Sequence, residues 1–217
     1  MKKFTTAIDN FQAILFDFDG VLAESMNVKT EAFEQLFKPY GNKVTKKVIK
    51  HHIENGGISR YKKIKYYYSN FLNKEISDDK LEEIAKQFSD IVVNKVILSD
   101  WVKGAKDFLE KYYIKIDLYV ISGTPQKEME LIIKKRDMDK YFKGIYGTPD
   151  TKPIIAKRII KQNNYDQKKV IYVGDCLSDY HDSIEADIPF LGRATDKNNS
   201  IFPEEVDIIS DFFEILK

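Results

Sequence analysis

Three short apolar runs, each followed by a polar cluster, constrain the fold of this chain more than any other feature. Residues 13–16, 116–121 and 170–173 are rich in β-branched and aromatic side chains and are bounded by Gly, Asp or Ser. Runs of this length and composition are typical of buried strands. Helical spacing of apolar residues is found at 104–113, 125–136, 153–161 and 177–186. Because strands alternate with amphipathic helices, we predict an α/β fold with a doubly wound parallel sheet covered on both faces.

Residues 27–97 interrupt this alternation. The segment is rich in Lys, Glu, Tyr and Phe, and its apolar residues recur at helical spacing without a convincing strand. We expect a small helical domain inserted after the first strand, so that residues 1–26 and 98–217 form the core domain. On pattern alone, the segment could also supply four more helices of a single domain.

The charge balance and the single cysteine limit the partners and the compartment. Lys and Arg total 35 and Asp and Glu total 34, so a general nucleic-acid or membrane-surface binder is not expected. Cys176 cannot form an internal disulfide, and no apolar run is long enough for a membrane span or a signal core. We expect a cytoplasmic monomer or homodimer that acts on a small molecule.

Four aspartates follow two of the predicted strands. Asp17 and Asp19 lie two residues apart after the first run, so an extended backbone points both side chains the same way. Asp175 follows the third run, and Asp179 lies one helical turn further on. Ionised carboxylates this close need a cation, and oxygen ligands without a His or Cys cluster favour Mg²⁺. Either pair alone could be an ordinary strand end or an acidic helix start, but together they predict a metal site.

Groups that could bind an anion follow the second run. Ser122 and Gly123 precede Thr124-Pro125, which we expect to open a helix and to present free backbone N–H groups. Lys152 begins another predicted helix and could neutralise the aspartates and a phosphate. The first segment could instead be an ordinary N-cap, and the lysine could be solvated. Since ligands bind at the carboxyl ends of parallel strands, we expect these groups to meet the aspartates there.

In this order, the motifs resemble the haloacid dehalogenase superfamily of hydrolases. They are Asp-x-Asp-Gly-Val at 17–21, Ser-Gly at 122–123, Lys-Pro at 152–153 and Gly-Asp-x-x-x-Asp at 174–179. The resemblance spans nearly the whole chain and is closest to the phosphoglycolate phosphatase and β-phosphoglucomutase branch. It implies a Rossmannoid core with a small helical cap. It also implies a Mg²⁺-dependent phosphatase that hydrolyses a small phosphate monoester through a phospho-aspartyl intermediate.

The resemblance implies a role for each matching residue. Asp17 would be the nucleophile, and Asp19 would act as acid and then as base. The implied metal ligands are Asp17, Asp19 through its carbonyl, Asp175, and Asp179 directly or through water. Ser122 and Gly123 would bind the phosphoryl oxygens, and Lys152 would neutralise charge. Carbon–halogen hydrolases of the superfamily need neither an acid–base aspartate at the position of Asp19 nor magnesium, so phosphoryl transfer is favoured.

One loop of the expected cap could select the substrate. Gly57-Ile58-Ser59-Arg60 resembles the cap loop of β-phosphoglucomutase-type proteins, in which an arginine meets a polar or anionic part of the substrate. We therefore expect Arg60 to bind substrate, with His52 and Asn55 behind it. A plain helix start with a solvated arginine is the alternative. The lysines of the following helix are expected on its solvent face, at Lys62, Lys63 and Lys65.

Two other functions share parts of this pattern. A phosphomutase acting on a sugar phosphate also needs Asp19, and would return the phosphoryl group to the sugar. A non-enzymatic phospho-acceptor resembling a receiver domain also uses a strand-end aspartate, Mg²⁺, Ser or Thr, and Lys. The position of Asp17 on the first strand and the large insertion after it argue against a receiver. No Gly-x-Gly-x-x-Gly follows a strand, which argues against a dinucleotide-binding protein.

Overall fold

A six-stranded parallel sheet forms the core of the protein. The computed structural model describes residues 8–216, so the first seven residues of the predicted core segment and Lys217 lie outside it. The strands are β1 (Ala13–Phe16), β2 (Asp117–Pro125), β3 (Gly144–Thr148), β4 (Val170–Gly174), β5 (Phe190–Arg193) and β6 (Ile208–Ile209). Their order is β3-β2-β1-β4-β5-β6, and every pairing is parallel. The predicted α/β fold with a doubly wound sheet is confirmed.

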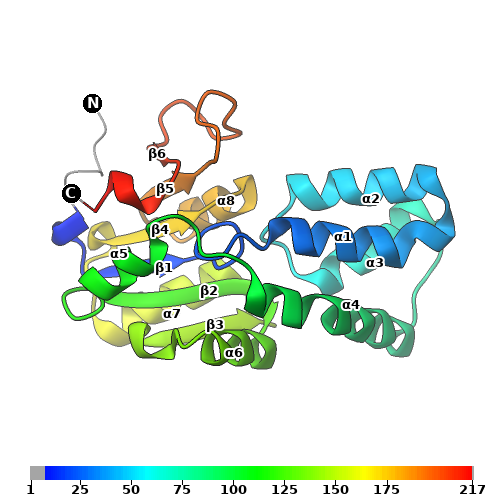
Figure 1. Ribbon diagram of the computed structural model, residues 1–217, viewed down its shortest axis with the longest axis horizontal. Coiled ribbons are helices and arrows are strands. Elements are labelled where there is room, and N and C mark those ends of the chain that lie inside the picture. Colours follow the sequence, from blue (N-terminus) through cyan, green and yellow to red (C-terminus); the bar gives the residue numbers. More distant parts are fainter. Residues whose placement is uncertain (1–7, 217) are drawn as a thin grey trace.

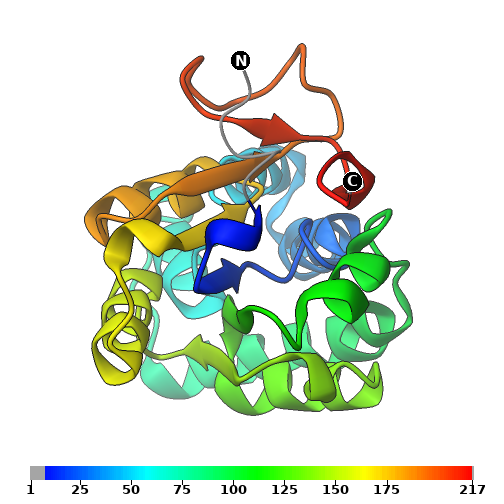
Figure 2. The same cartoon turned by 90° about the vertical axis from the view of Figure 1, so that its left-hand side faces the viewer.

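Helices cover both faces of the sheet because side chains alternate along each strand. Ile14 and Phe16 belong to one buried cluster, shared with α5 (Ala105–Tyr112) and α6 (Gln126–Lys135). Ala13 and Leu15 belong to a second cluster, shared with α7 (Lys152–Asn163) and with residues of α8 (Leu177–Glu185). Figure 2 shows α7 and α8 on one side of the sheet and α5 on the other.

Four helices form a lobe beyond the carboxyl ends of the strands (Figure 1). They are α1 (Met26–Phe37), α2 (Asn42–Glu54), α3 (Arg60–Phe71) and α4 (Asp78–Leu98), and no strand lies among these residues. We call residues 26–98 the helical lobe. Its interior is aromatic: the rings of Phe33 and Phe88 lie 4.5 Å apart and those of Phe37 and Tyr67 lie 5.3 Å apart. Such ring pairs add to the free energy of burial and hold the helices together.

Two neighbouring chain segments join the lobe to the core. The N–H of Glu24 donates to the carbonyl of Asp100 at 2.9 Å, so the entering and leaving segments are hydrogen-bonded. Arg136, just after α6, donates to three backbone carbonyls at the end of α4 over 2.7–2.9 Å. These bonds satisfy carbonyls that a helix end leaves unpaired. The end of α4 is therefore attached directly to the core.

No helix in the described part of the chain combines the length and the hydropathy that crossing a bilayer requires.

Candidate active site

The ends of three adjacent strands bring the predicted residues together. Phe16 of β1 pairs with Val120 of β2 and with Val173 of β4, so Asp17, Ile121 and Gly174 follow at the same level. One expectation is corrected for Thr124-Pro125, which ends β2 rather than opening a helix. β2 continues to Pro125 with a shift of register after Ile121, and α6 begins only at Gln126. Proline is compatible with extended backbone, so Thr124 and Pro125 continue the strand instead of beginning the helix.

Asp17 and Asp179 share Lys152. The Nζ of Lys152 lies 3.1 Å from Oδ1 of Asp17 and 2.5 Å from Oδ1 of Asp179. All three side chains are buried. Burial raises the pKa of Asp17 to about 7, although Lys152 opposes this shift. Burial acts against the charge of Lys152 too, but the two carboxylates raise its pKa well above the ordinary value. A further cation near Asp17 would favour its ionised, nucleophilic form.

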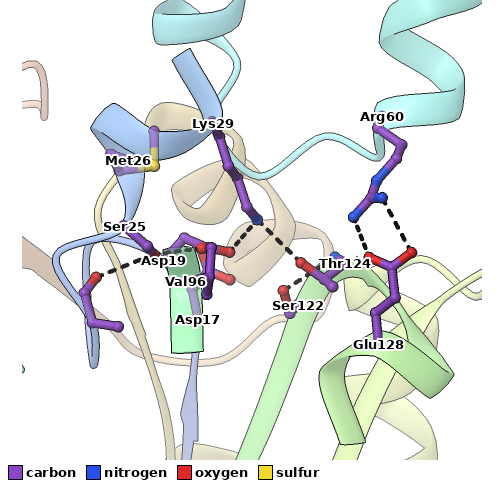
Figure 3. A network of polar contacts seen from close by, with 12 residues as sticks. Asp17, Asp19, Ser25, Met26, Lys29, Arg60, Val96, Ser122, Thr124 and Glu128 are labelled. Carbon is purple, nitrogen blue, oxygen red and sulfur yellow. Dashed lines mark hydrogen bonds and ion pairs between the residues drawn. The ribbon is translucent and has the colours of Figure 1, made fainter. Parts of the chain in front are cut away.

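Asp19 is held by two residues of the segment that follows it (Figure 3). The hydroxyl of Ser25 donates to Oδ1 of Asp19 at 2.5 Å, and Lys29 of α1 donates to Oδ2. Lys29 also donates to the hydroxyl of Thr124 at 3.1 Å. Burial would raise the pKa of Asp19, but Lys29 outweighs it and the pKa is lowered. Lys29 was not predicted as a site residue; its position one turn after Ser25, at the start of an amphipathic helix, was the available signal.

Asp175 has the free oxygen that a metal site needs. Its Oδ1 is buried and has no hydrogen-bond partner among the described residues. Burial and the neighbouring Asp17 and Asp179 raise its pKa well above the ordinary value. Buried carboxylate oxygens without a partner are rare in folded proteins, and a bound ion can satisfy them. The oxygen-rich site therefore fits a hard divalent cation such as Mg²⁺.

Asp179 is more fully engaged than Asp175. Its Oδ1 accepts from Lys152 and, at 3.2 Å, from the hydroxyl of Tyr172. Its Oδ2 accepts from the backbone N–H of Asp175 at 3.3 Å and from the thiol of Cys176 at 3.0 Å. Asp179 thus orients both Lys152 and the backbone of Asp175.

Gly20 leaves room for this arrangement. It has a φ of +77°, which favours glycine, and a Cβ there would lie 2.0 Å from Oδ2 of Asp175. The turn after Asp19 can therefore pass Asp175 only without a side chain.

Residues 14–192 match the family model of haloacid dehalogenase-like hydrolases. The chain belongs to this family. The family predicted from the motifs is confirmed, and the chain is an enzyme, a hydrolase of the phosphatase type. This removes the non-enzymatic phospho-acceptor as an alternative.

Relatives agree with this assignment. A phosphorylated carbohydrates phosphatase from Thermotoga maritima is 26% identical over 180 residues, or 77% of each chain. A predicted phosphoglycolate phosphatase from Haemophilus somnus has a TM-score of 0.72 at 19% identity, covering 95% of this chain and 97% of that one. The HAD-hydrolase YfnB from Bacillus subtilis, bound to magnesium, has a TM-score of 0.67 at 16% identity, covering 94% and 96%. The two structures show that the fold is shared.

Arg60 of this hydrolase links the lobe to the core. Its guanidinium donates to Glu128 of α6 through two bonds of 3.1 and 2.6 Å (Figure 3). It also lies over the ring of Phe88, 4.7 Å from the centroid. Arg60 is buried rather than solvated, so the alternative of a plain exposed helix start is wrong. An arginine–carboxylate pair is strongest when two parallel hydrogen bonds join the groups, as they do here, and Glu128 already balances the charge of Arg60.

The other cap residues have different surroundings. His52 is buried, and its Nδ1 lies 2.8 Å from Nζ of Lys63. Asn55 donates from its amide to the carbonyl of His51 at 2.9 Å. The expectation that Lys63 faces solvent is wrong: it is 2% exposed, while Lys62 and Lys65 are exposed. The loop before α3 and the end of α2 cover Lys63, so this side of the helix faces protein.

The loop at 55–59 separates two cavities. A small one of about 20 Å³ lies towards the nucleophile and is lined by Asp17, Asp19 and residues of the lobe. A larger cleft of about 980 Å³ lies on the other side and reaches Ser122 and Lys152. Gly57 and Gly123 line both cavities, and a Cβ on Gly123 would lie 2.5 Å from the carbonyl oxygen of Gly57. The lobe loop therefore lies directly against the expected phosphate-binding segment.

Proposed function

We propose that this hydrolase is a Mg²⁺-dependent phosphatase. It removes the phosphoryl group of a small phosphorylated metabolite through a phospho-aspartyl intermediate. The observation that carries the proposal is the contact of Lys152 with Asp17, beside a second aspartate, Asp19, that is held separately by Lys29. One carboxylate is thus placed as a nucleophile beside a cation, and the other is placed for proton transfer. The phosphorylated carbohydrates phosphatase relative supports a sugar phosphate as the substrate.

Mg²⁺ would be held by Asp17, by the carbonyl of Asp19 and by Asp175, whose Oδ1 is without a partner among the described residues. The engaged oxygens of Asp179 favour contact with the ion through water. When bound, the ion neutralises charge between the carboxylates and the phosphate. The magnesium bound to the YfnB structure supports this choice of ion.

The first step is attack by Asp17 on phosphorus. Ser122, the backbone N–H of Gly123, and Lys152 bind the phosphoryl oxygens, which carry the charge of the transition state. The bond to the leaving oxygen breaks as the bond to Asp17 forms. Asp19 in its protonated form gives its proton to that oxygen. Because Lys29 lowers the pKa of Asp19, the negative charge of the bound substrate is needed to raise this pKa again and populate the acid form.

The second step is hydrolysis of the phospho-aspartate. Asp19, now ionised, takes a proton from water, and the hydroxide attacks phosphorus and releases Asp17. Inorganic phosphate leaves, and Asp19 is protonated again.

A screen of phosphate release over small phosphorylated metabolites tests the proposal. We expect turnover by the wild type with Mg²⁺, loss of turnover on chelation, and no turnover by Asp17→Asn. A variant as active as wild type on the best substrate would exclude Asp17 as nucleophile. Product analysis with a sugar phosphate separates hydrolysis from the phosphomutase alternative, since a mutase would yield an isomeric sugar phosphate instead of inorganic phosphate.

We also propose that residues 27–97 act as a cap domain on a core of residues 1–26 and 98–217. The helical lobe and the paired segments at Glu24 and Asp100 support this division. The cytoplasmic location and the monomeric or homodimeric state stay predictions.

A further inference from the structure

Lys63 is a buried ammonium group without a carboxylate partner among the described residues. Its Nζ contacts Nδ1 of His52 at 2.8 Å, the carbonyl of Gly56 at 3.3 Å and the carbonyl of His52 at 3.4 Å. These neutral acceptors hold the group in place but do not balance its charge. Buried charges are normally paired, so an ammonium group in this state is suited to receive an anion.

His52 adds an N–H group without a hydrogen-bond acceptor among the described residues. A charged Lys63 can only donate, so Nδ1 of His52 accepts from it and the ring proton lies on Nε2. Nε2 has no partner among the described residues, and the side chain is 1% exposed. The ring lies 4.9 Å from that of Phe33, which leaves this N–H in an apolar setting. A buried N–H without an acceptor is costly, and an oxygen atom of a ligand would satisfy it.

Both residues line the small cavity that also contains Asp17 and Asp19. Two more cations line it, but both already have partners: Lys29 is paired with Asp19 and Arg60 with Glu128. The unbalanced charge of this cavity is therefore that of Lys63. At about 20 Å³, the cavity has room for a group of a few atoms and not for a sugar ring.

We propose that Lys63 and His52 bind a second anionic group of the substrate, a carboxylate or a second phosphoryl group on the leaving group. This inference rests on the proposed phosphatase function and makes Lys63 a specificity-determining residue. We expected Arg60 to bind an anionic part of the substrate. Because Glu128 already balances the charge of Arg60, we assign this role to Lys63 instead.

The electrostatics agree with this geometry. Burial, together with Lys29, lowers the pKa of Lys63 to about 7, and burial together with Lys63 lowers the pKa of His52 to about 2. His52 therefore stays neutral and donates only from Nε2. An anion bound beside Lys63 would favour its charged form and offset its burial.

The test compares matched substrates that differ only in the second anion. One pair is 2-phosphoglycolate and 2-hydroxyethyl phosphate, and the other is glucose 1,6-bisphosphate and glucose 1-phosphate. We expect Lys63→Met to lower kcat/KM for the member with the second anion, in at least one pair, by about tenfold to a hundredfold more than for the partner that lacks it. The pair that responds tells whether the anion is a carboxylate or a phosphate. Lys65→Met, an exposed lysine on the same helix, should change neither value.

Equal losses for both members of both pairs would overturn the inference and leave the phosphatase proposal intact. If no substrate is turned over, the phosphatase proposal fails by itself. Calorimetric titration of the Asp17→Asn protein with the same four compounds then gives an independent result. There, Lys63→Met should selectively weaken binding of the two compounds that carry the second anion, and unchanged affinities would overturn the inference. Thermal unfolding of each variant confirms that it is folded.

Discussion

Lys29 of the helical lobe is ion-paired with Asp19 of the core. The same ammonium group reaches Thr124 at the end of β2, so a single lobe residue touches two sides of the proposed reaction centre. The proton affinity of Asp19 therefore depends on where the lobe lies. Movement of the lobe away from the core would remove the cation that lowers the pKa of Asp19.

Lys29→Met should slow turnover by about tenfold to a hundredfold, because a charged hydrogen bond to the acid–base group is lost. Burial alone would then act on Asp19 and raise its pKa. The basic limb of the profile of kcat/KM against pH, which reports loss of the acid form of Asp19 in the first step, should move to higher pH. Lys95→Met is the matched control, since Lys95 forms an exposed ion pair with Glu31 on the same helix as Lys29. An unshifted basic limb would remove Lys29 from this role.

Asp175→Asn should abolish the stabilisation of the protein by Mg²⁺. In the wild type, an ion at one hundred times its Kd should raise the free energy of unfolding by about 2.7 kcal/mol. The variant should also unfold at a higher temperature than wild type when no metal is present, because it removes a charge from a buried cluster of carboxylates. Thermal unfolding with and without Mg²⁺ measures both effects. The control is Asp90→Asn, which breaks an exposed ion pair with Lys86 and should keep the full rise in unfolding temperature on addition of Mg²⁺. If Asp175→Asn also kept this rise, Asp175 would not be a ligand.

Glu128→Ala should destabilise the protein by about 3 kcal/mol, because it leaves the buried Arg60 without its carboxylate. Arg60→Met combined with Glu128→Ala should recover part of this loss, since no unpaired charge remains. Urea unfolding of the wild type, both single variants and the double variant gives the coupling energy between the two residues. Strictly additive changes would show that the pair does not tie the lobe to the core.

The stability of the ligand-free protein should depend on pH through Lys63. Its pKa is about 7 in the folded protein and 10.5 as the ordinary value, so the unfolded chain binds more protons between these limits. The cost of burying the charge is fully present below pH 7 and disappears as the pH rises towards 10.5, so stability rises over this window, by at most about 1.4 kcal/mol per pH unit. The free energy of unfolding of the wild type should therefore increase relative to Lys63→Met between pH 7 and pH 10. A constant difference between the two proteins would contradict the lowered pKa of Lys63.

Local patterns predicted three adjacent strands of the sheet and missed both edge strands and β5, whose four residues include Gly192 and Arg193 and so form no continuous apolar run. β1, β2 and β4 were expected because each is a run of buried apolar residues, and they lie side by side in the structure. β3, β5 and β6 were not singled out. β3 is at one edge and largely half-buried, so it has no continuous apolar run, and β6 has only two residues. Edge strands need less burial and show a weaker pattern.

The sequence by itself determined which aspartates follow the strands, because neighbouring residues on one strand share local geometry. Parallel pairing then brings Asp17, Ser122 and Asp175 to one edge, as expected from their positions at the carboxyl ends of parallel strands. Only the tertiary structure decided the partners of Lys29, Arg60 and Lys63. Their surroundings come from segments distant in the chain or from the packing of one helix against a loop. The periodicity of a helix cannot tell which of its faces another element will cover. For that reason a lysine expected in water lies buried and lines the same cavity as the proposed nucleophile.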